Sequence, residues 1–485
     1  MSRILPKLCL LAGFIATSAM GQTLSTTSIS LGHPANGDVE RVGEYLAVSG
    51  HSAENRWLSL IGLDDFSHLS VEIPSDAQFF GRMKLADEAN EQLVFLTQEG
   101  LRAFSPQHEQ HRALVEFSSI YPLADRQRLR FKDFARDVTG SGLSDLLIPD
   151  FKFYHLIIQQ ANGEFESFRL NVDAQVRTTD TNAQFTPRRP YLVDMSLNGK
   201  TDVVFVRDGK LLAFFQREDG TFSEDPMVID PGVGISPDHE ANIRAGDGRD
   251  FAGLRIYRMH EFQDLDGDGL ADLVVREESF ASAVEQDYTY RIHYGREGEA
   301  GLEFAAEPDT RIATSGIQFE PVFEDINGNG RKDFYTPSAQ FGVGTIIRAL
   351  LRGSARLDIE FYMMDESRNF PREPTYRHRA SADVSIGSGR VDLPLVKVAR
   401  FDNSGRKSLL VGEGRSELAV YAPVQDGLFE RRPTTFSMSL PRDGARARVM
   451  DLDHAGIEEL VLPFDAQDEE GRRNRVVFLM VVDED

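Results

Sequence analysis

The chain has 485 residues, of which 53 are Lys or Arg and 77 are Asp or Glu, so its formal net charge is −24. Such a charge argues against sequence-independent binding to nucleic acid, which depends on cations that meet phosphates. It also argues against docking on anionic lipid. Solubility alone explains an acidic surface, but many of these acids fall in one recurrent loop.

The first residues have the layout of a secretory signal peptide. Two cations precede an apolar run at 8–16, and Ala19 and Gly21 have the spacing of a signal-peptidase site. We expect residues 1–21 to be removed and the protein to be exported to the periplasm, the cell surface or the medium. The apolar run is too short to span a bilayer.

The mature chain, 22–485, is expected to lack thiols and integral membrane segments. The single cysteine, Cys9, lies inside the signal peptide. Disulfides, cysteine-based zinc sites and cysteine nucleophiles are therefore excluded. An exported protein of this length without disulfides needs a large core, metal ions or both for rigidity.

One pattern recurs along the mature chain. It consists of an acid, alternating oxygen-bearing side chains, a glycine, and a second acid that opens an apolar run of β type. Four clear copies occupy 137–145, 194–202, 264–272 and 325–333, and worn copies begin near Phe401 and Asp451. Successive copies start roughly 50 to 75 residues apart, which is the size of a four-stranded propeller blade with its loops.

The segments between the loops read as strands. Residues 203–206 and 211–215, joined by a short turn at 207–210, have the chemistry of a hairpin. Another strand is expected at 357–363. Helical periodicity is almost absent, and the one predicted helix, 345–352, lies in a longer insertion at 344–390. The fold class is therefore all-β.

The two ends of the chain are expected to meet. The last apolar run, 476–482, lacks an outer neighbour, and residues 26–31 resemble 434–440, the expected outer strand of the preceding unit. An N-terminal strand that completes the last blade removes exposed sheet edges. With a first blade built from 42–49 and 57–63, the sequence predicts one propeller domain of eight four-stranded blades, with seven as the close alternative.

The recurrent loops are predicted to bind Ca²⁺. Oxygens at positions one, three and five point to one centre, glycine at six permits a turn with positive φ, and position seven supplies a backbone carbonyl. An acid at position nine replaces the Glu that EF-hand loops carry at twelve, and a strand follows instead of a helix. The predicted ligands are Asp137, Thr139, Ser141, Leu143 and Asp145; Asp194, Ser196, Asn198, Lys200 and Asp202; Asp264, Asp266, Asp268, Leu270 and Asp272; and Asp325, Asn327, Asn329, Arg331 and Asp333.

The alternative for each loop is an Asx turn without an ion. It is weakest for 264–272, because four carboxylates in nine residues repel unless a cation lies among them. It stays open for 137–145, where Thr139 and Ser141 are weak ligands. It is favoured at 451–459, where Ala455 removes a ligand. The copy near Phe401 lacks an acid at position nine and is expected to be ion-free.

The run Asp-x-Asp-x-Asp-Gly-x-x-Asp-Leu-x-Val, which stands here from Asp264 to Val275, resembles the signature of the FG-GAP/VCBS repeat family. Blades of this family also build the head of integrin α-subunits. The resemblance extends over nearly the whole mature chain. It implies a propeller with calcium in hairpin loops on one face, and it leaves the blades with Ser404, Ser408 and Ala455 without an expected ion. It does not identify a ligand, because propellers host many functions.

Known catalytic spacings are missing from the mature chain. His260-Glu261 lacks the second histidine of a zinc protease, and nucleophile elbows, P-loops and dinucleotide fingerprints are not found. A basic cluster in the insertion, Arg368, Arg372, Arg377, His378 and Arg379, is a candidate for holding an anionic ligand or a glycan. Its predicted contacts are Arg372, Arg377 and Tyr376. The alternative is a solvated insertion whose cations pair with neighbouring acids.

The sequence therefore predicts a non-enzymatic, monomeric, extracytoplasmic module that binds a protein or polysaccharide partner at a loop face, or acts as a scaffold. The alternative is a propeller enzyme, a lyase or hydrolase of polysaccharide, which needs an acid, a base and a cation in one groove.

Overall fold

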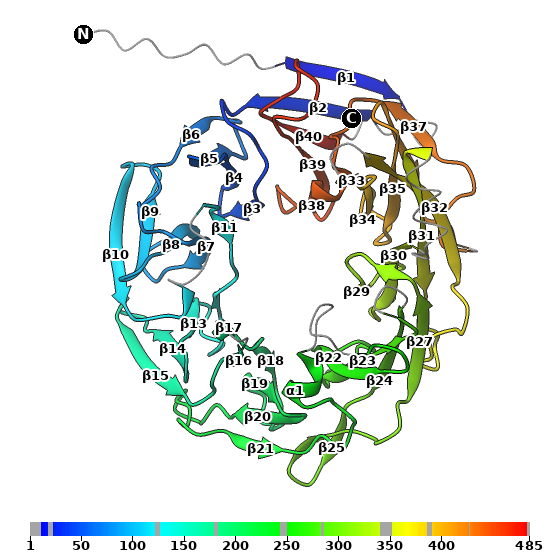
Figure 1. The fold of residues 1–485 in the computed structure, drawn as a ribbon. Coiled ribbons are helices and arrows are strands. Elements are labelled where there is room, and N and C mark those ends of the chain that lie inside the picture. The colour runs from blue at the N-terminus through cyan, green and yellow to red at the C-terminus, as the bar shows by residue number, and fades with distance from the viewer. Residues whose placement is uncertain are drawn as a thin grey trace.

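The computed structural model describes residues 11–17, 23–121, 127–178, 183–242, 250–282, 286–339, 352–385, 390–425 and 427–482. Its strands form a ring of small, largely antiparallel sheets (Figure 1). Eight of these sheets contain four or more strands, and the two others are two-stranded. The protein is an eight-bladed all-β propeller, as the sequence predicts, and the seven-bladed alternative is wrong.

The first four blades follow one another along the chain, and each runs from an inner to an outer strand (Figure 1). Their strands are β3 (Val39–Val42), β4 (Tyr45–His51), β5 (Arg56–Gly62) and β6 (His68–Ser70); β7 (Phe79–Lys84), β8 (Glu91–Leu96), β9 (Gly100–Ser105) and β10 (Gln110–Glu116), with β11 (Arg130–Phe131) parallel to β7; β12 (Ala135–Arg136), β13 (Asp145–Pro149), β14 (Tyr154–Gln159) and β15 (Phe165–Leu170); and β18 (Tyr191–Val193), β19 (Asp202–Arg207), β20 (Lys210–Phe214) and β21 (Met227–Ile229).

The other four blades repeat this order, and the sixth is the widest. Their strands are β22 (Arg255–Gln263), β23 (Asp272–Phe280), β24 (Gln286–His293) and β27 (Thr310–Ser315); β29 (Val322–Glu324), β30 (Asp333–Ala339), β31 (Ser354–Tyr362) and β32 (Tyr376–Ser385), extended by β28 (Ile317–Gln318) and β33 (Arg390–Asp392); β34 (Val396–Ala399), β35 (Ser408–Glu413), β36 (Glu417–Tyr421) and β37 (Thr434–Ser437); and β38 (Arg448–Met450), β39 (Glu459–Phe464), β40 (Arg475–Val482) and β2 (Thr23–Ser30).

The second strand of most blades is buried on both faces. All five residues of β13 and all six of β39 are buried, which explains why these strands read as continuous apolar runs rather than alternating ones. The core clusters cross from blade to blade. Val274 of the fifth blade, for example, packs in one cluster with Phe334 of the sixth. Burial of apolar surface between blades therefore joins the ring.

The ring closes through the N-terminal strand. β2 pairs antiparallel with β40, with Leu24 opposite Val481 and Ile29 opposite Val476. Leu24 and Ile29 are buried among residues of the last blade and its neighbours. This confirms that an N-terminal strand completes the last blade. A fifth strand, β1 (Leu11–Thr17), pairs with the outer edge of β2 and lies inside the predicted signal peptide.

Two local predictions are confirmed and one lies outside the described residues. The hairpin of β19 and β20 turns through Asp208 (φ 49°) and Gly209 (φ 78°), the two positive φ values of a type I′ turn. The strand predicted at 357–363 is β31. Of the predicted helix at 345–352, residues 345–351 are not among the described residues.

Short elements between blades enter the inner side of the ring. The hairpin of β16 (Gln175–Thr178) and β17 (Ala183–Thr186) connects the third blade to the fourth, and the single helical turn α1 (Asp238–Ala241) connects the fourth to the fifth. Figure 1 shows both on the inner side of the blades. A second hairpin, β25 (Arg296–Gly298) and β26 (Gly301–Glu303), and a 3-10 turn at Gly444–Arg446 complete the elements.

Candidate metal sites

Every acidic loop occupies the same place in its blade. Each connects the innermost strand to the second strand, so the loops at 137–144, 194–201, 264–271, 325–332, 400–407 and 451–458 follow β12, β18, β22, β29, β34 and β38. Because the blades share one meander, this connection always emerges on the same face of the ring. The loops are therefore neighbours around one face.

Neighbouring loops in the second half of the ring are joined through their backbones. The bonds run from Lys332 N to Leu265 O (2.7 Å), from Lys407 N to Ile326 O (2.9 Å) and from Glu458 N to Arg400 O (2.8 Å). The approach is close enough to require glycine. A Cβ on Gly267 would lie 2.9 Å from Gly330 O, and one on Gly328 would lie 2.7 Å from Gly405 O.

The first acid of each clear loop closes the turn. The two carboxylate oxygens of Asp264 accept from Gly267 N (2.7 Å) and Gly269 N (3.0 Å). Asp137, Asp194 and Asp325 accept in the same way from backbone N–H groups of their own loops. A carboxylate offers about four lone-pair sites, so these bonds leave it able to accept a cation as well.

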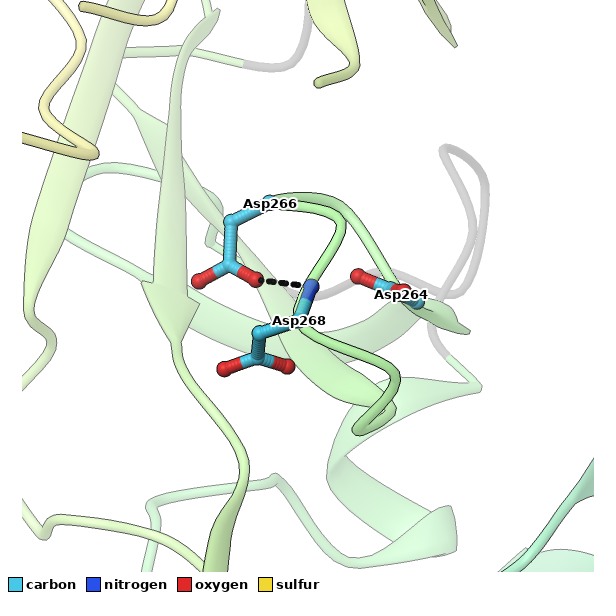
Figure 2. Close-up of side chains that lie close together, drawn as sticks. All are labelled: Asp264, Asp266 and Asp268. Carbon is cyan, nitrogen blue, oxygen red and sulfur yellow. Dashed lines mark hydrogen bonds between the residues drawn. The ribbon is translucent and has the colours of Figure 1, made fainter. Parts of the chain in front are cut away.

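Three acids of the loop in the fifth blade gather around one point. Each of Asp264, Asp266 and Asp268, called here the first triad, offers an oxygen, and these oxygens lie within 4.8 Å of one another. Figure 2 shows the three side chains around the turn, with Asp266 accepting from Asp268 N (3.1 Å). Burial raises the pKa of Asp266, and the neighbouring charge of Asp268 raises it further. Hard oxygen donors at this spacing fit Ca²⁺.

The acids at position nine lie apart from this triad. Asp272 is fully buried, and its two oxygens accept from Leu265 N (2.8 Å) and Gly295 N (2.9 Å). The carboxylate thus fastens the start of its loop to the residue that follows the third strand. Asp145, Asp202 and Asp333 are buried and bonded in the same manner. In this arrangement position nine holds the loop together, and its predicted role as a metal ligand stays a prediction.

Burial governs the acidity of these fastening carboxylates. It raises the pKa of Asp272 to about 7, against the opposing effect of the backbone donors at Gly295 and Leu265. It raises the pKa of Asp333 to about 7 in the same way, against Met364 and Ile326. These groups are therefore sensitive to the loss or gain of positive charge nearby.

The residues at position seven all turn their backbone in the same way. The N–H donates to the side-chain oxygen at position five, and this holds for Leu143, Lys200, Leu270 and Arg331. Asn329 also donates its N–H to Asn327 Oδ1 (3.1 Å). In the first loop, the Thr139 hydroxyl lies 3.1 Å from Ser141 Oγ and 3.0 Å from Asp145 Oδ2. The hydroxyl groups of that loop are thus satisfied internally.

The first triad has a cation from the neighbouring blade. Arg368, in the turn between β31 and β32, donates through one guanidinium nitrogen to Asp266 (2.7 Å) and Asp268 (3.1 Å). The Asp266 side chain is fully buried, whereas that of Arg368 is 46% exposed. The guanidinium lies 5.0 Å from the ring centre of Tyr294, whose hydroxyl donates to Arg368 O. Sequence reasoning placed Arg368 in a basic cluster and missed this pair.

A second group of carboxylates lies in the worn loop of the last blade. Asp451, Asp453 and Glu459, the second triad, offer oxygens within 4.8 Å of one another. Glu459 uses one oxygen to accept from Leu452 N (2.8 Å). Asp451 Oδ1 is buried and has no hydrogen-bond partner among the described residues. Burial raises the pKa of Glu459 to about 7, and the charges of Asp453 and Asp451 add to the shift.

This second triad differs from the expectation that the loop at 451–459 is a poor ligand set. Ala455 does remove one ligand, but Glu459 stands where the clear copies carry Asp. Its extra methylene lets the carboxylate reach both the backbone and the other acids. Within the described part of the chain, no Lys, Arg or His forms a salt bridge with these three carboxylates. The Glu at position nine was the signal available in the sequence.

The predicted basic site is not assembled as one surface. Arg377 pairs with Glu360 (2.6 Å) and Arg379 lies 3.6 Å from Asp358, which is the alternative of cations that pair with neighbouring acids. Tyr376 packs edge-on against Phe361 and Phe429. Arg372 is exposed. Contact of Arg372, Arg377 and Tyr376 with a ligand stays a prediction.

No described helix is long and apolar enough to cross a membrane. No protein-family model matches the sequence, and no curated protein matches it.

Three solved structures resemble the chain. A lectin of Agrocybe aegerita that recognises non-reducing terminal N-acetylglucosamine has 14% identity and a TM-score of 0.44, over 84% of this chain and 93% of that chain. A protein from Lactobacillus plantarum has 9% identity and a TM-score of 0.30, over 83% and 98%. The V. cholerae biofilm matrix protein Bap1 has 12% identity and a TM-score of 0.25, over 92% and 76%. Similarities this distant carry no argument on function.

Proposed function

We propose that the chain is a calcium-binding β-propeller of the FG-GAP/VCBS type that works outside the cytoplasm as a binding or scaffold module and not as an enzyme. The observation that carries the proposal is the convergence of carboxylate oxygens in the first triad, within 4.8 Å of one another. The second triad lies in the equivalent loop of another blade, on the same face.

Bound Ca²⁺ supplies positive charge and coordination to oxygens that otherwise repel. The loops are joined to one another by backbone bonds such as Lys332 N to Leu265 O. An ion held in one loop therefore also stabilises the loop beside it. This gives a rigid face, without disulfides, on which a protein or glycan partner can be held. Export is supported by the N-terminal signal and by the absence of cysteine after Cys9.

Metal analysis of the purified mature protein after extensive dialysis tests the proposal. The wild type is expected to retain Ca²⁺, and two double variants, Asp264→Asn with Asp268→Asn and Asp451→Asn with Asp453→Asn, are each expected to lose about one ion, because neutral amides bind Ca²⁺ more weakly than carboxylates. The control replaces two exposed acids outside the loops, Asp219→Asn with Asp230→Asn. If all three variants keep the same Ca²⁺ as the wild type, the loops are not the sites.

A further inference from the structure

A polar pocket lies on the inner side of the ring, between the inserted hairpin and the segment around α1. Its volume is about 190 Å³, below the roughly 300 to 1,000 Å³ of sites for drug-sized ligands. It can therefore hold one or two small polar units, not a large apolar molecule. Its polar lining residues are Gln175, Arg177, Gln184, Thr186, Asn242 and Arg258.

The register of the hairpin places four of these residues on one face. Gln175 lies opposite Thr186, and Arg177 lies opposite Gln184. Because side chains alternate along a strand, all four point to the same side. Phe185, between them, points the other way and packs edge-on against Phe151, with ring centres 4.9 Å apart. The hairpin thus presents a wholly polar face to the pocket.

A buried arginine fixes the two walls of the pocket to each other. Arg188 is 6% exposed. Its guanidinium donates to Asp238 of α1 (2.7 Å), to Val206 O of the fourth blade (2.8 Å) and to Asp173 O beside the hairpin (2.8 Å). The other oxygen of Asp238 accepts from Gln175 Nε2 (3.3 Å). The pocket is therefore preorganised by a buried ion pair, which reduces the cost of ordering a ligand site.

The charge of the pocket is opposite to that of the chain. Arg177 and Arg258 line it, and none of its described lining residues is Asp or Glu. Asp238 beneath it is neutralised by Arg188. On the far side, Glu278 is shared by two cations, since one of its oxygens accepts from both Arg258 (3.1 Å) and Arg276 (2.5 Å). Positive charge is thus in excess around the pocket.

We propose that this pocket binds a carboxylate-bearing sugar unit of an acidic polysaccharide. Guanidinium groups match carboxylates in geometry and charge, which assigns the carboxylate to Arg177 and Arg258. The amide side chains of Gln175, Gln184 and Asn242 both donate and accept, as the hydroxyl groups of a sugar require. The inference rests on the proposed function, because it names the ligand class of the same binding module, but it uses residues on other loops than the calcium sites.

Affinity electrophoresis of the mature protein through gels that contain a defined polymer tests the inference. Alginate is the carboxylate-bearing glycan, dextran is the neutral glycan, dextran sulfate has the same backbone with sulfate groups, and poly-glutamate is the acidic peptide. We expect retardation by alginate and no comparable retardation by the other three. Equal or stronger retardation by dextran sulfate or poly-glutamate would overturn the inference, because charge alone or an acidic peptide would then explain binding.

Two variants assign the binding to the pocket. Arg177→Gln and Gln184→Ala are each expected to weaken alginate binding about 10-fold or more, since hydrogen bonds to charged groups contribute strongly and a tenfold change is a modest difference in free energy. Arg311→Gln, an exposed arginine of β27 that pairs with Glu307, is the control and is expected to bind as the wild type does. Unchanged binding by both pocket variants, at an unchanged melting temperature, would contradict the inference.

The outcome is separable from that of the proposed function. A wild-type protein that retains Ca²⁺ but shows no retardation by alginate would remove the sugar site and leave the calcium propeller standing. A metal-free protein that is retarded by alginate, and loses this with Arg177→Gln, would keep the pocket and remove the calcium sites.

Discussion

The guanidinium of Arg368 lies 2.7 Å from a carboxylate oxygen of Asp266, although 102 residues separate the two in the chain. Arg368 has a positive φ of 64° in a turn that Asp365 closes by accepting from Asn369 N (2.8 Å). Tyr294 holds the same residue through its ring and its hydroxyl. The blade that follows the first triad thus supplies a tethered monovalent cation where a divalent ion would bind.

Replacing this cation should have opposite effects on the metal-free and the calcium-loaded protein. Arg368→Met leaves the buried carboxylate of Asp266 without its partner, so the metal-free protein should lose about 1 to 3 kcal/mol of unfolding free energy. Calcium affinity at this loop should rise, because the ion no longer displaces a guanidinium. Urea unfolding with and without Ca²⁺, together with calorimetric titration, measures both.

The control for this exchange is Arg377→Met, which removes the pair with Glu360 far from the loops. It should leave calcium affinity unchanged. A calcium affinity for Arg368→Met that equals the wild type, or falls below it, would show that the arginine does not compete with the ion.

The fastening role of position nine can be separated from a ligand role. Asp272→Asn keeps one acceptor but turns an amide N–H₂ toward a backbone N–H, so it should cost about 1 to 3 kcal/mol even in a chelator. Asp268→Asn keeps the acceptor for Leu270 N and should change metal-free stability little while it weakens calcium binding. Denaturant unfolding in a chelator, well above the pKa of Asp272, compares the two. Equal metal-free stability of both variants contradicts the fastening role.

His260 should make the protein sensitive to acid. Burial, together with the nearby charges of Arg276 and Arg189, lowers its pKa from 6.5 to about 3. As pH falls through 6.5 the unfolded chain takes up a proton and the folded protein does not, so stability is complete above this pH and falls below it. At pH 5 the loss is about 2 kcal/mol.

His260→Phe should reduce this loss, since the ring lies among Tyr290 and Phe323 and an apolar ring needs no proton. Some dependence should remain, because burial also lowers the pKa of His33, His155 and His378. The unfolding free energies of both proteins at neutral pH and at pH 5 provide the comparison. A wild-type difference that His260→Phe leaves unaltered would place the acid sensitivity elsewhere.

Closure of the ring should depend on the buried side chains of β2. Ile29 is 3% exposed and pairs with Val476. Ile29→Ala should lower the unfolding free energy by about 2 to 5 kcal/mol, because it removes buried methyl groups and leaves a cavity. Ser30→Ala, at an exposed position of the same strand, should have almost no effect. Similar melting temperatures for the two variants would mean that the strand contributes little to closure.

The fold could be predicted from the sequence because its determinants are local and repeated. The loops at 137–145, 194–202, 264–272 and 325–333 mark successive blades, and the likeness of 26–31 to 434–440 shows which strand closes the ring. The candidate sites were predicted only in part. The Asp-x-Asp-x-Asp spacing locates the first triad, since neighbours in a tight turn must converge.

The contacts that decide the behaviour of the sites depend on approach in space. Arg368 meets Asp266 only because the sixth blade packs beside the fifth. Asp272 looks like a fifth ligand in the sequence, but the end of the third strand brings Gly295 N to it. Nothing local in the sequence announces either approach. The second triad was obscured because Ala455 was weighed more heavily than the longer side chain of Glu459.

The central claim, that cations in the acidic loops stabilise the ring, is tested most directly by thermal unfolding of the mature protein in Ca²⁺ and in a chelator. An ion that binds only the folded state adds about 2.7 kcal/mol at ~100 times its Kd. We therefore expect a clearly higher Tm in Ca²⁺, and a smaller gain when the acids of the first triad, Asp264 and Asp268, are replaced by Asn. A Tm that is the same in Ca²⁺ and in the chelator would contradict the account.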